Sequence, residues 1–210
     1  DGHGIKMGII LGFTGPIETL TPAMAASAEL AFKEASDSGS LLGGKYIKAM
    51  RGDSTCADSA AGTTAAQGLI DGGVVAIMGA DCSGVTTAIA DNAAIPNGVV
   101  MISPSATSPA LTSINDNGYF FRTAPSDARG GEILAKITKD RKVKSVAITY
   151  TNNDYGKGLA DVYESFVKSL GIKVTAVTAH EEGKADYGAE VATLAAAGGE
   201  ALAVLGYLDQ

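Results

Sequence analysis

Hydroxyl side chains lie in two short segments that each follow a run of apolar residues, one hydroxyl in the first segment and four in the second. Segment 79–84 (GADCSG) follows the apolar run 74–78, and segment 103–109 (SPSATSP) follows the run 98–103. Hydroxyl groups both donate and accept hydrogen bonds, so these segments suit a small ligand with a carboxylate and an ammonium group. Ser83 is expected at the start of a helix, where free N–H groups favour a carboxylate. A plain capping serine and a turn-rich loop are the alternative interpretations.

Residue types for catalysis or metal binding are sparse. The two histidines, His3 and His180, lie far apart in the sequence, and we expect His3 in the terminal tail and His180 in a polar loop after a strand. No pair of residues has metal-ligand spacing, and no G-x-S-x-G nucleophile motif occurs. The glycines of segment 12–16 (GFTGP) do not form the dinucleotide fingerprint, so a turn is expected there. The sequence favours binding without a metal or cofactor, and a nucleotide-dependent α/β enzyme stays an alternative.

Composition excludes several classes of protein. The net charge of -7 and the scattered basic residues argue against a nucleic-acid partner. Hydrophobic residues make up 46% of the chain, which is enough for a packed core. No apolar run approaches the roughly 20 residues that span a bilayer. Residues 1–4 (DGHG) lack the basic and apolar parts of a signal peptide, so we expect that one has been removed.

Apolar runs alternate with amphipathic segments, which predicts an α/β fold with parallel sheets. Strands are expected at 5–11, 45–51, 74–78, 98–103, 143–150, 172–178 and 201–205, and helices at 22–39, 57–71, 84–94, 127–141, 155–170 and 187–197. We expect Thr21 to cap the first helix, with Pro22 in its first turn. An irregular stretch, 104–125, divides the chain into two domains, 1–121 and 122–210. The second has only three expected strands, so we expect a C-terminal part to be missing.

Six segments across the chain match one known family in order and spacing. They are 14–16 (TGP), 53–56 (DSTC), 82–83 (CS), 101–109 (MISPSATSP), 121–123 (FRT) and 154–159 (DYGKGL). On these segments the chain resembles the leucine/isoleucine/valine-binding proteins, which are type I periplasmic binding proteins of ABC transporters. The resemblance implies the type I periplasmic-binding-protein fold, in which two Rossmann-like lobes are built on parallel sheets. The second lobe is expected to be incomplete.

The resemblance also assigns ligand contacts in the first lobe. Ser83 would hold the ligand carboxylate through its hydroxyl and its backbone N–H. Ser105 would accept a hydrogen bond from the ligand ammonium with its backbone carbonyl, and Thr107 would contact both groups. Ala106, between them, is included in the expected site.

In the second lobe, the resemblance implies that Tyr155 closes over the ligand and that Tyr207 makes a further contact. Leu20 stands where the leucine-binding members often have an aromatic residue. The acidic partner of the ligand ammonium is expected beyond residue 210. The last two features leave the identity of the ligand open.

Cys56 and Cys82 are the only cysteines, and each follows an expected strand of the first lobe. The resemblance implies that they form a disulfide, because the family pairs these positions. Two buried free thiols are the alternative. A disulfide would indicate an oxidising compartment such as the periplasm.

These observations together predict an extracytoplasmic solute-binding protein and not an enzyme. We expect it to capture an amino acid or a similar small carboxylate between its two lobes and to deliver it to the membrane subunits of an ABC transporter. A ligand-sensing regulatory or receptor domain of the same fold is the alternative function.

Overall fold

A computed structural model describes residues 4–207, and these residues form two compact units. The first unit holds residues up to 106 together with 114–124, and the second holds 107–113 together with the residues from 125 onward. The domain bounds expected from the sequence, 1–121 and 122–210, stay a prediction. The grouping by contacts differs from them because the segment 107–113 belongs with the second unit and 122–124 with the first.

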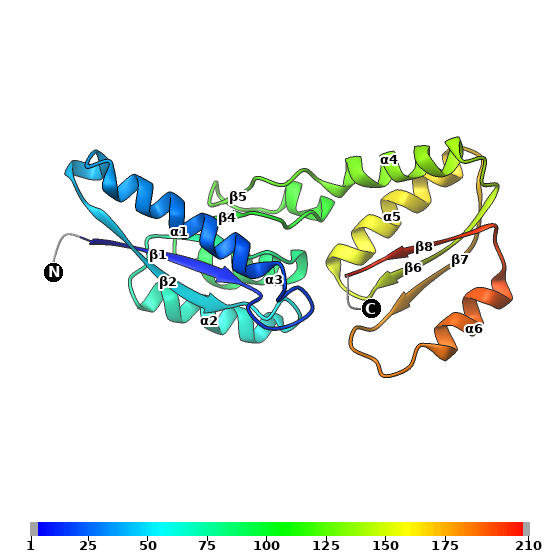
Figure 1. The fold of residues 1–210 in the computed structure, drawn as a ribbon, viewed down its shortest axis with the longest axis horizontal. Helices are drawn as coiled ribbons and strands as arrows, with labels where there is room; N and C mark the ends of the chain where they lie inside the picture. The colour runs from blue at the N-terminus through cyan, green and yellow to red at the C-terminus, as the bar shows by residue number, and fades with distance from the viewer. Residues whose placement is uncertain (1–3, 208–210) are drawn as a thin grey trace. The chain divides into compact units, whose positions relative to one another are not determined.

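A five-stranded parallel sheet forms the centre of the first unit, in the order β2-β1-β3-β4-β5. Its strands are β1 (Gly4–Leu11), β2 (Tyr46–Asp53), β3 (Ala76–Gly79), β4 (Val100–Ser103) and β5 (Phe120–Arg122), which Figure 1 labels. The chain adds β2 on one side of β1 and then places β3 on the other side. Ligands of such sheets bind outside the carboxyl ends of the strands where the order reverses. A ligand site is therefore expected at the carboxyl ends of β1 and β3.

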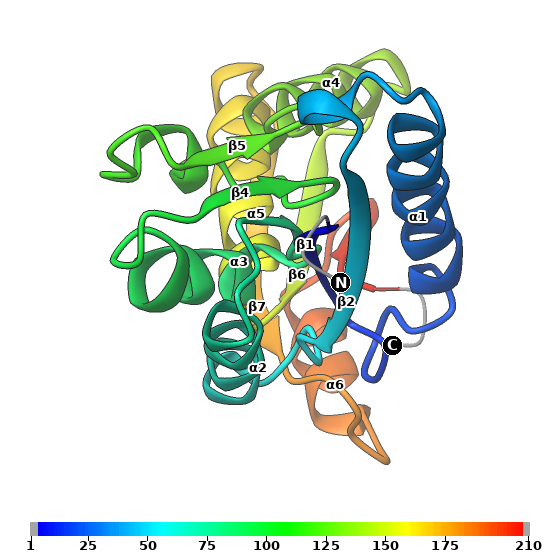
Figure 2. The same ribbon diagram turned by 90° about the vertical axis from the view of Figure 1, so that its left-hand side faces the viewer.

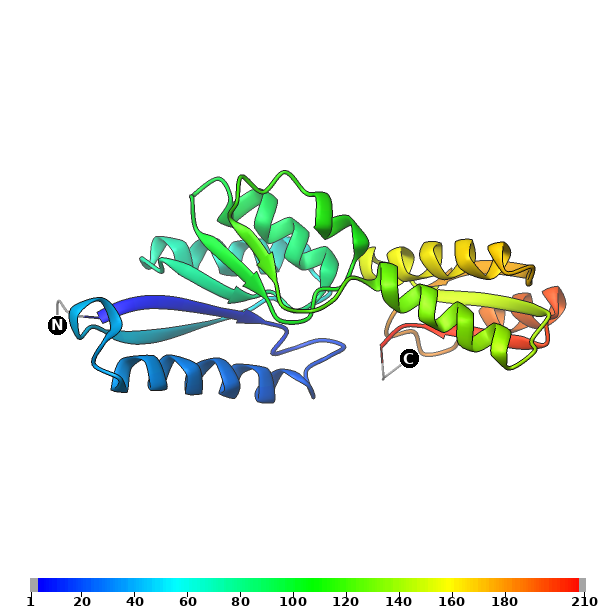
Figure 3. The same cartoon turned by 90° about the horizontal axis from the view of Figure 1, so that it is seen from above.

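Helices cover both faces of this sheet. Helix α1 (Thr21–Asp37) lies on one face, and α2 (Ser59–Asp71) and α3 (Ser83–Ile89) lie on the other, as Figures 2 and 3 show from two directions. A π-helical turn, η2 (Ala90–Ala94), continues α3, and a short 3-10 helix, η1 (Leu41–Gly43), precedes β2. Alanines on the inner side of α1 pack against the apolar residues of β1, so small side chains let this helix approach the sheet closely.

Two local predictions for the first unit are wrong. Leu20, and not Thr21, occupies the N-cap position of α1, and the Thr21 hydroxyl donates a hydrogen bond to the Gly12 carbonyl oxygen at 2.8 Å. Thr21 therefore holds the loop after β1 against the helix. Strand β5 lies in the stretch 104–125 that was expected to be irregular. Its three residues are too few for a periodic pattern, and pairing with β4 makes them a strand.

The second unit has a three-stranded parallel sheet in the order β7-β6-β8. Its elements are η3 (Pro109–Ser113), α4 (Asp127–Asp140), β6 (Ser145–Thr151), α5 (Asp154–Ser169), β7 (Lys173–His180), α6 (Gly188–Ala197) and β8 (Ala201–Leu205). Helices α4 and α5 pack together on one face, and α6 lies on the other (Figure 1). His180 was expected in a loop, but it is the last residue of β7 and is buried.

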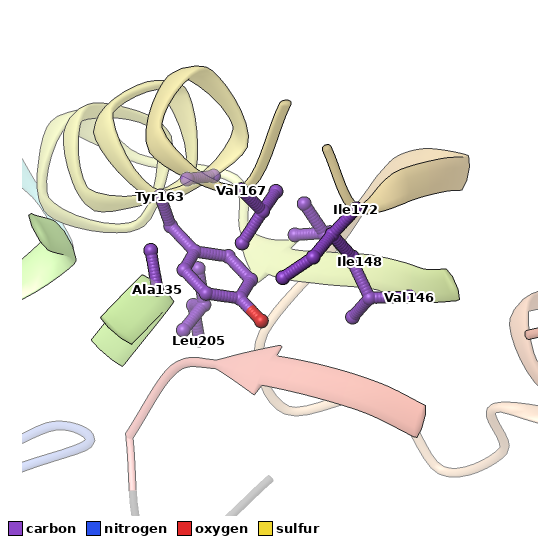
Figure 4. Packing of buried hydrophobic residues seen from close by; sticks show 8 residues of the cluster. Ala135, Val146, Ile148, Tyr163, Val167, Ile172 and Leu205 are labelled. Atoms are coloured by element: carbon purple, nitrogen blue, oxygen red, sulfur yellow. The ribbon is translucent and has the colours of Figure 1, made fainter. Parts of the chain in front are cut away.

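The core of the second unit lies between α5 and the sheet. Figure 4 shows Tyr163 and Val167 of α5 pointing toward Ile148 of β6 and Leu205 of β8. The Tyr163 hydroxyl forms a hydrogen bond of 2.8 Å with the Thr138 hydroxyl of α4, so this large side chain is buried with its polar end satisfied. This packing fixes α5 on the sheet and thereby positions the segment 153–156 at its start.

Candidate ligand-binding residues

A disulfide joins the end of β2 to the start of α3. Cys56 and Cys82 are paired, their Cα atoms are 5.3 Å apart, and both side chains are buried. The pairing implied by the resemblance is therefore confirmed, and the two-thiol alternative is wrong. The bond holds together the loops that leave the ends of β2 and β3, the strands on either side of β1, so it restricts the region in which Ser83 lies.

The segments 14–16 and 53–56 bind each other. The Thr14 hydroxyl donates to Asp53 Oδ2 at 2.7 Å, and the Thr55 amide donates to Asp53 Oδ1 at 2.9 Å. Partial burial raises the pKa of Asp53, but the hydrogen bonds from Thr14 and Thr55 outweigh this effect and hold the pKa below its ordinary value. At Gly15 the backbone has φ +100°, and a Cβ there would lie 2.2 Å from the Thr55 carbonyl oxygen. These motif residues thus shape the loops at the edge of the sheet.

Asp81 is a buried carboxylate at the point where the strand order reverses. Its Oδ2 accepts a hydrogen bond of 2.7 Å from the Gly12 amide, and its Oδ1 accepts from the Ser54 hydroxyl at 3.2 Å and the Cys82 amide at 3.0 Å. Burial raises the pKa of Asp81 above its ordinary value, and these hydrogen bonds oppose the rise. Asp81 therefore ties the ends of β1, β2 and β3 together. Sequence reasoning missed this residue because its partners are up to 69 positions away.

Ser83, Ser105 and Ala106 belong to the first unit. Ser83 is the first residue of α3, as predicted, and it is only 1% exposed. Ser105 is half-buried, and its hydroxyl donates to the Asp81 carbonyl oxygen at 3.0 Å. Ala106 is buried, and its carbonyl oxygen accepts a hydrogen bond of 3.1 Å from Arg122. The structure thus brings the β3 and β4 loops together, with Ser105 more accessible than Ser83.

Thr107 lies next in sequence but belongs to the second unit. Its hydroxyl donates to Asp127 Oδ2 at 2.6 Å, and its carbonyl oxygen accepts from the Asp127 amide at 2.9 Å. Both residues are half-buried. Asp127 is the first residue of α4, where a negative charge is favoured by the helix dipole. Sequence analysis did not select Asp127, although its position after the capping Ser126 was a usable signal.

Tyr155 and Tyr207 lie together in the second unit. Their rings stack with centroids 5.2 Å apart and an angle of 22° between the ring planes. Burial and the negative charge of Asp127 raise the pKa of Tyr155, so its hydroxyl stays protonated at neutral pH. Both rings are half-buried. The two tyrosines predicted as ligand contacts therefore form one aromatic pair, near the carboxylate that also binds Thr107.

Asn153 and Gly156 set the position of Tyr155. The Asn153 side chain caps α5 by accepting a hydrogen bond of 2.9 Å from the Gly156 amide. A Cβ on Gly156 would lie 2.2 Å from the Thr151 carbonyl oxygen, so only glycine lets the first turn of α5 pack on the end of β6. Close packing against Thr151 thus explains the glycine of the D-Y-G segment.

Leu20 belongs to the first unit and His180 to the second. Leu20 is 47% exposed at the start of α1, and a role in ligand binding stays a prediction. His180 Nδ1 and the Thr149 hydroxyl are 2.8 Å apart within the sheet of the second unit. Within residues 4–207 there is no cluster of three or more side chains suited to hold a metal ion. None of the helices in this part of the chain is long and apolar enough to span a membrane.

Comparison with known proteins identifies the family. Residues 4–210 match the family model described as periplasmic binding protein. The chain belongs to this family. Periplasmic binding proteins bind ligands and are not enzymes, which confirms the prediction made from the sparse catalytic residues.

The relatives of this periplasmic binding protein include Leu/Ile/Val-binding proteins. It is 30% identical to Leu/Ile/Val-binding protein homolog 3 of Brucella melitensis, over 97% of this chain and 54% of the relative. It is 32% identical to Leu/Ile/Val-binding protein BraC3 of Rhizobium johnstonii, over 88% of this chain and 50% of that relative. The solved leucine binding protein of Thermotoga maritima has a TM-score of 0.85 at 25% identity and covers 95% of this chain and 55% of its own.

A second solved structure, the branched-chain amino acid substrate-binding protein of Streptococcus pneumoniae in complex with isoleucine, gives a TM-score of 0.81 at 27% identity, over 96% of this chain and 56% of its own. The predicted fold and family resemblance are confirmed by these comparisons. The chain spans about half the length of the relatives it matches.

Proposed function

We propose that this chain binds an amino acid or a similar small carboxylate, with branched-chain amino acids as the first candidates, and delivers it to the membrane subunits of an ABC transporter. The observation that carries the proposal is the match of nearly the whole chain to binding proteins that include a leucine binding protein and one solved with isoleucine. Because the chain spans about half of these relatives, the activity of the whole protein is part of the proposal.

The proposed ligand contacts are Ser83, Ser105, Ala106, Thr107, Leu20, Tyr155 and Tyr207. Ser105 and Thr107 are the best candidates for direct contact with the ligand, because both side chains are half-buried whereas Ser83 is nearly completely buried. The Thr107 hydroxyl already donates to Asp127, which leaves its oxygen as an acceptor for a ligand ammonium. The aromatic pair offers apolar surface for an aliphatic side chain.

Calorimetry with leucine, isoleucine and valine tests the proposal. We expect Thr107→Val, which removes the hydroxyl and keeps the shape, to weaken binding about tenfold, the equivalent of about 1.4 kcal/mol. Thr64→Val is the matched control, because Thr64 is an exposed threonine of α2 whose hydroxyl bonds only within its own helix. If the folded chain binds none of the three amino acids, the branched-chain amino acids are wrong as its ligands.

Export from the cytoplasm is part of the proposal. The buried disulfide supports it, because disulfides persist in oxidising compartments and are rare in the cytosol. Release of the protein from host cells by osmotic shock, with its cysteines unreactive toward thiol reagents after denaturation, is the expected result. Reactive cysteines in the protein from these cells would contradict this location.

A further inference from the structure

A basic surface lies at the end of the second unit where its strands begin. Segment 136–144 (KITKDRKVK) holds five of the sixteen basic residues of the chain and one acidic residue, although the net charge of the chain is -7. The Lys173 amide donates to the Lys144 carbonyl oxygen at 2.9 Å, so the start of β7 lies beside this segment. Figure 1 shows the end of α4 and the starts of β6 and β7 at the same end of the unit. We call the exposed side chains there the basic end, which consists of Lys139, Arg141, Lys142, Lys144 and Lys173.

Carboxylates neutralise little of the charge of the basic end. Within residues 4–207, none of its five side chains forms an ion pair with a carboxylate. Glu200 lies at this end, but its Oε2 accepts from the backbone amide of Lys144 at 2.8 Å. The Lys139 ammonium group donates to the Leu170 carbonyl oxygen, which carries no net charge. The five positive charges therefore outnumber those of Glu200 and the exposed Asp140, and the surface stays positive.

Apolar side chains lie beside the basic end on α4. Ile133 and Ile137 are 42% and 44% exposed. With Arg141 they follow one another at intervals of four residues, so the three side chains lie along one face of the helix. Basic and exposed apolar side chains together are typical of helices that lie on a membrane surface. A surface for single-stranded nucleic acid would instead offer aromatic side chains for stacking, and the basic end contains none.

We infer that the basic end binds the surface of an anionic phospholipid membrane. Clusters of about four to eight lysines and arginines bind such surfaces by electrostatic attraction. The two exposed isoleucines favour a membrane over a soluble polyanion, because apolar side chains can enter the interface of a bilayer.

The basic end and the predicted ligand contacts lie at opposite ends of the sheet of the second unit. The basic end is at the amino ends of β6 and β7, whereas Tyr155 follows the carboxyl end of β6. Contact of the basic end with a membrane therefore does not use the tyrosine pair. The inference goes beyond the proposed function and does not depend on the identity of the ligand.

Cosedimentation of the full 210-residue chain with phospholipid vesicles tests the inference. The probes are vesicles of phosphatidylcholine alone and vesicles of equal parts of phosphatidylcholine and anionic phosphatidylglycerol. We expect binding to the mixed vesicles and none to phosphatidylcholine alone. Raising the ionic strength from about 0.1 M to about 1 M shortens the Debye length from about 10 Å to about 3 Å, so it should release the protein from the mixed vesicles.

Variants of exposed lysines locate the binding surface. Lys144→Gln combined with Lys173→Gln removes two charges of the basic end and should weaken binding to the mixed vesicles at least about tenfold. Lys45→Gln combined with Lys48→Gln is the matched control, because both lysines are exposed near the start of β2 and the net charge changes equally. The control should bind within about twofold of the unaltered chain, since its lysines lie in the first unit. Lys144→Arg combined with Lys173→Arg keeps both charges and should keep the binding.

Four results would overturn the inference. They are no binding to the mixed vesicles at about 0.1 M ionic strength, equal binding to both kinds of vesicle, equal losses in the glutamine variant and its control, and release from the mixed vesicles by polyglutamate at an equal concentration of negative charge. The last result would indicate a soluble acidic partner. Circular dichroism confirms that each variant is folded. Calorimetry of leucine binding uses no vesicles, so failure of this inference and failure of the proposed function are distinguishable.

Discussion

Replacing both Cys56 and Cys82 with alanine should destabilise the first unit by about 3.5 kcal/mol. The bond joins residues 26 positions apart. In the chain-entropy model, opening a loop of that length returns about 12 cal/mol/K of entropy to the unfolded chain, which is about 3.5 kcal/mol at 25 °C. Both cysteine side chains are buried, so lost packing adds to this figure, and alanine introduces no new polar group. The disulfide alone is thus comparable to a large part of the stability of an ordinary domain.

Native-state hydrogen exchange measures this change in each unit separately. The slowest amides of β1 and β3 report the free energy of unfolding of the first unit, and those of β6 in the second unit serve as an internal control. Reducing the disulfide of the unaltered chain should lower protection in the first unit in the same way. A loss below about 1 kcal/mol in the first unit, or an equal loss in both units, would refute the reasoning from loop entropy.

Three further predictions follow from single positions. Burial raises the pKa of Asp81, so the folded state binds this proton more tightly than the unfolded state does. The resulting contribution to stability is full below the unfolded pKa of about 3.9 and is lost as the pH rises through the folded pKa. In Asp81→Asn, the slope of the free energy of unfolding against pH that comes from this group should vanish, as measured by urea unfolding. Gly156→Ala should destabilise the second unit by more than about 2 kcal/mol in thermal unfolding, because its Cβ would lie 2.2 Å from the Thr151 carbonyl oxygen, and unchanged stability would show that α5 can shift freely. Gly68→Ala, at an exposed helical position with open space around the new Cβ, should instead stabilise the first unit by about 0.5–1 kcal/mol, and a loss in chemical denaturation would contradict the open space described there.

Periodicity in the sequence was sufficient to predict most strands and helices. Buried parallel strands appear as apolar runs such as 74–78, and α5 presents apolar residues at helical spacing, so both patterns are local. β5 escaped this reasoning because three residues carry no period and only hydrogen bonding to β4 makes them a strand. His180 was misplaced for a related reason, since β7 extends past the apolar run through its pairing with β6.

Some features of the candidate site likewise follow from the local sequence, and others follow only from the tertiary structure. The sequence by itself determined that hydroxyl-bearing loops follow β3 and β4 and that Ser83 begins a helix, because strand ends and helix starts are set by neighbouring residues. Only the tertiary structure decided that Ser83 is buried, that Thr107 binds Asp127 and that Lys173 lies beside Lys144. Thr107 and its partner lie 20 positions apart along the chain, and no local pattern specifies which distant residues the packing of helices on a sheet will bring within hydrogen-bond distance.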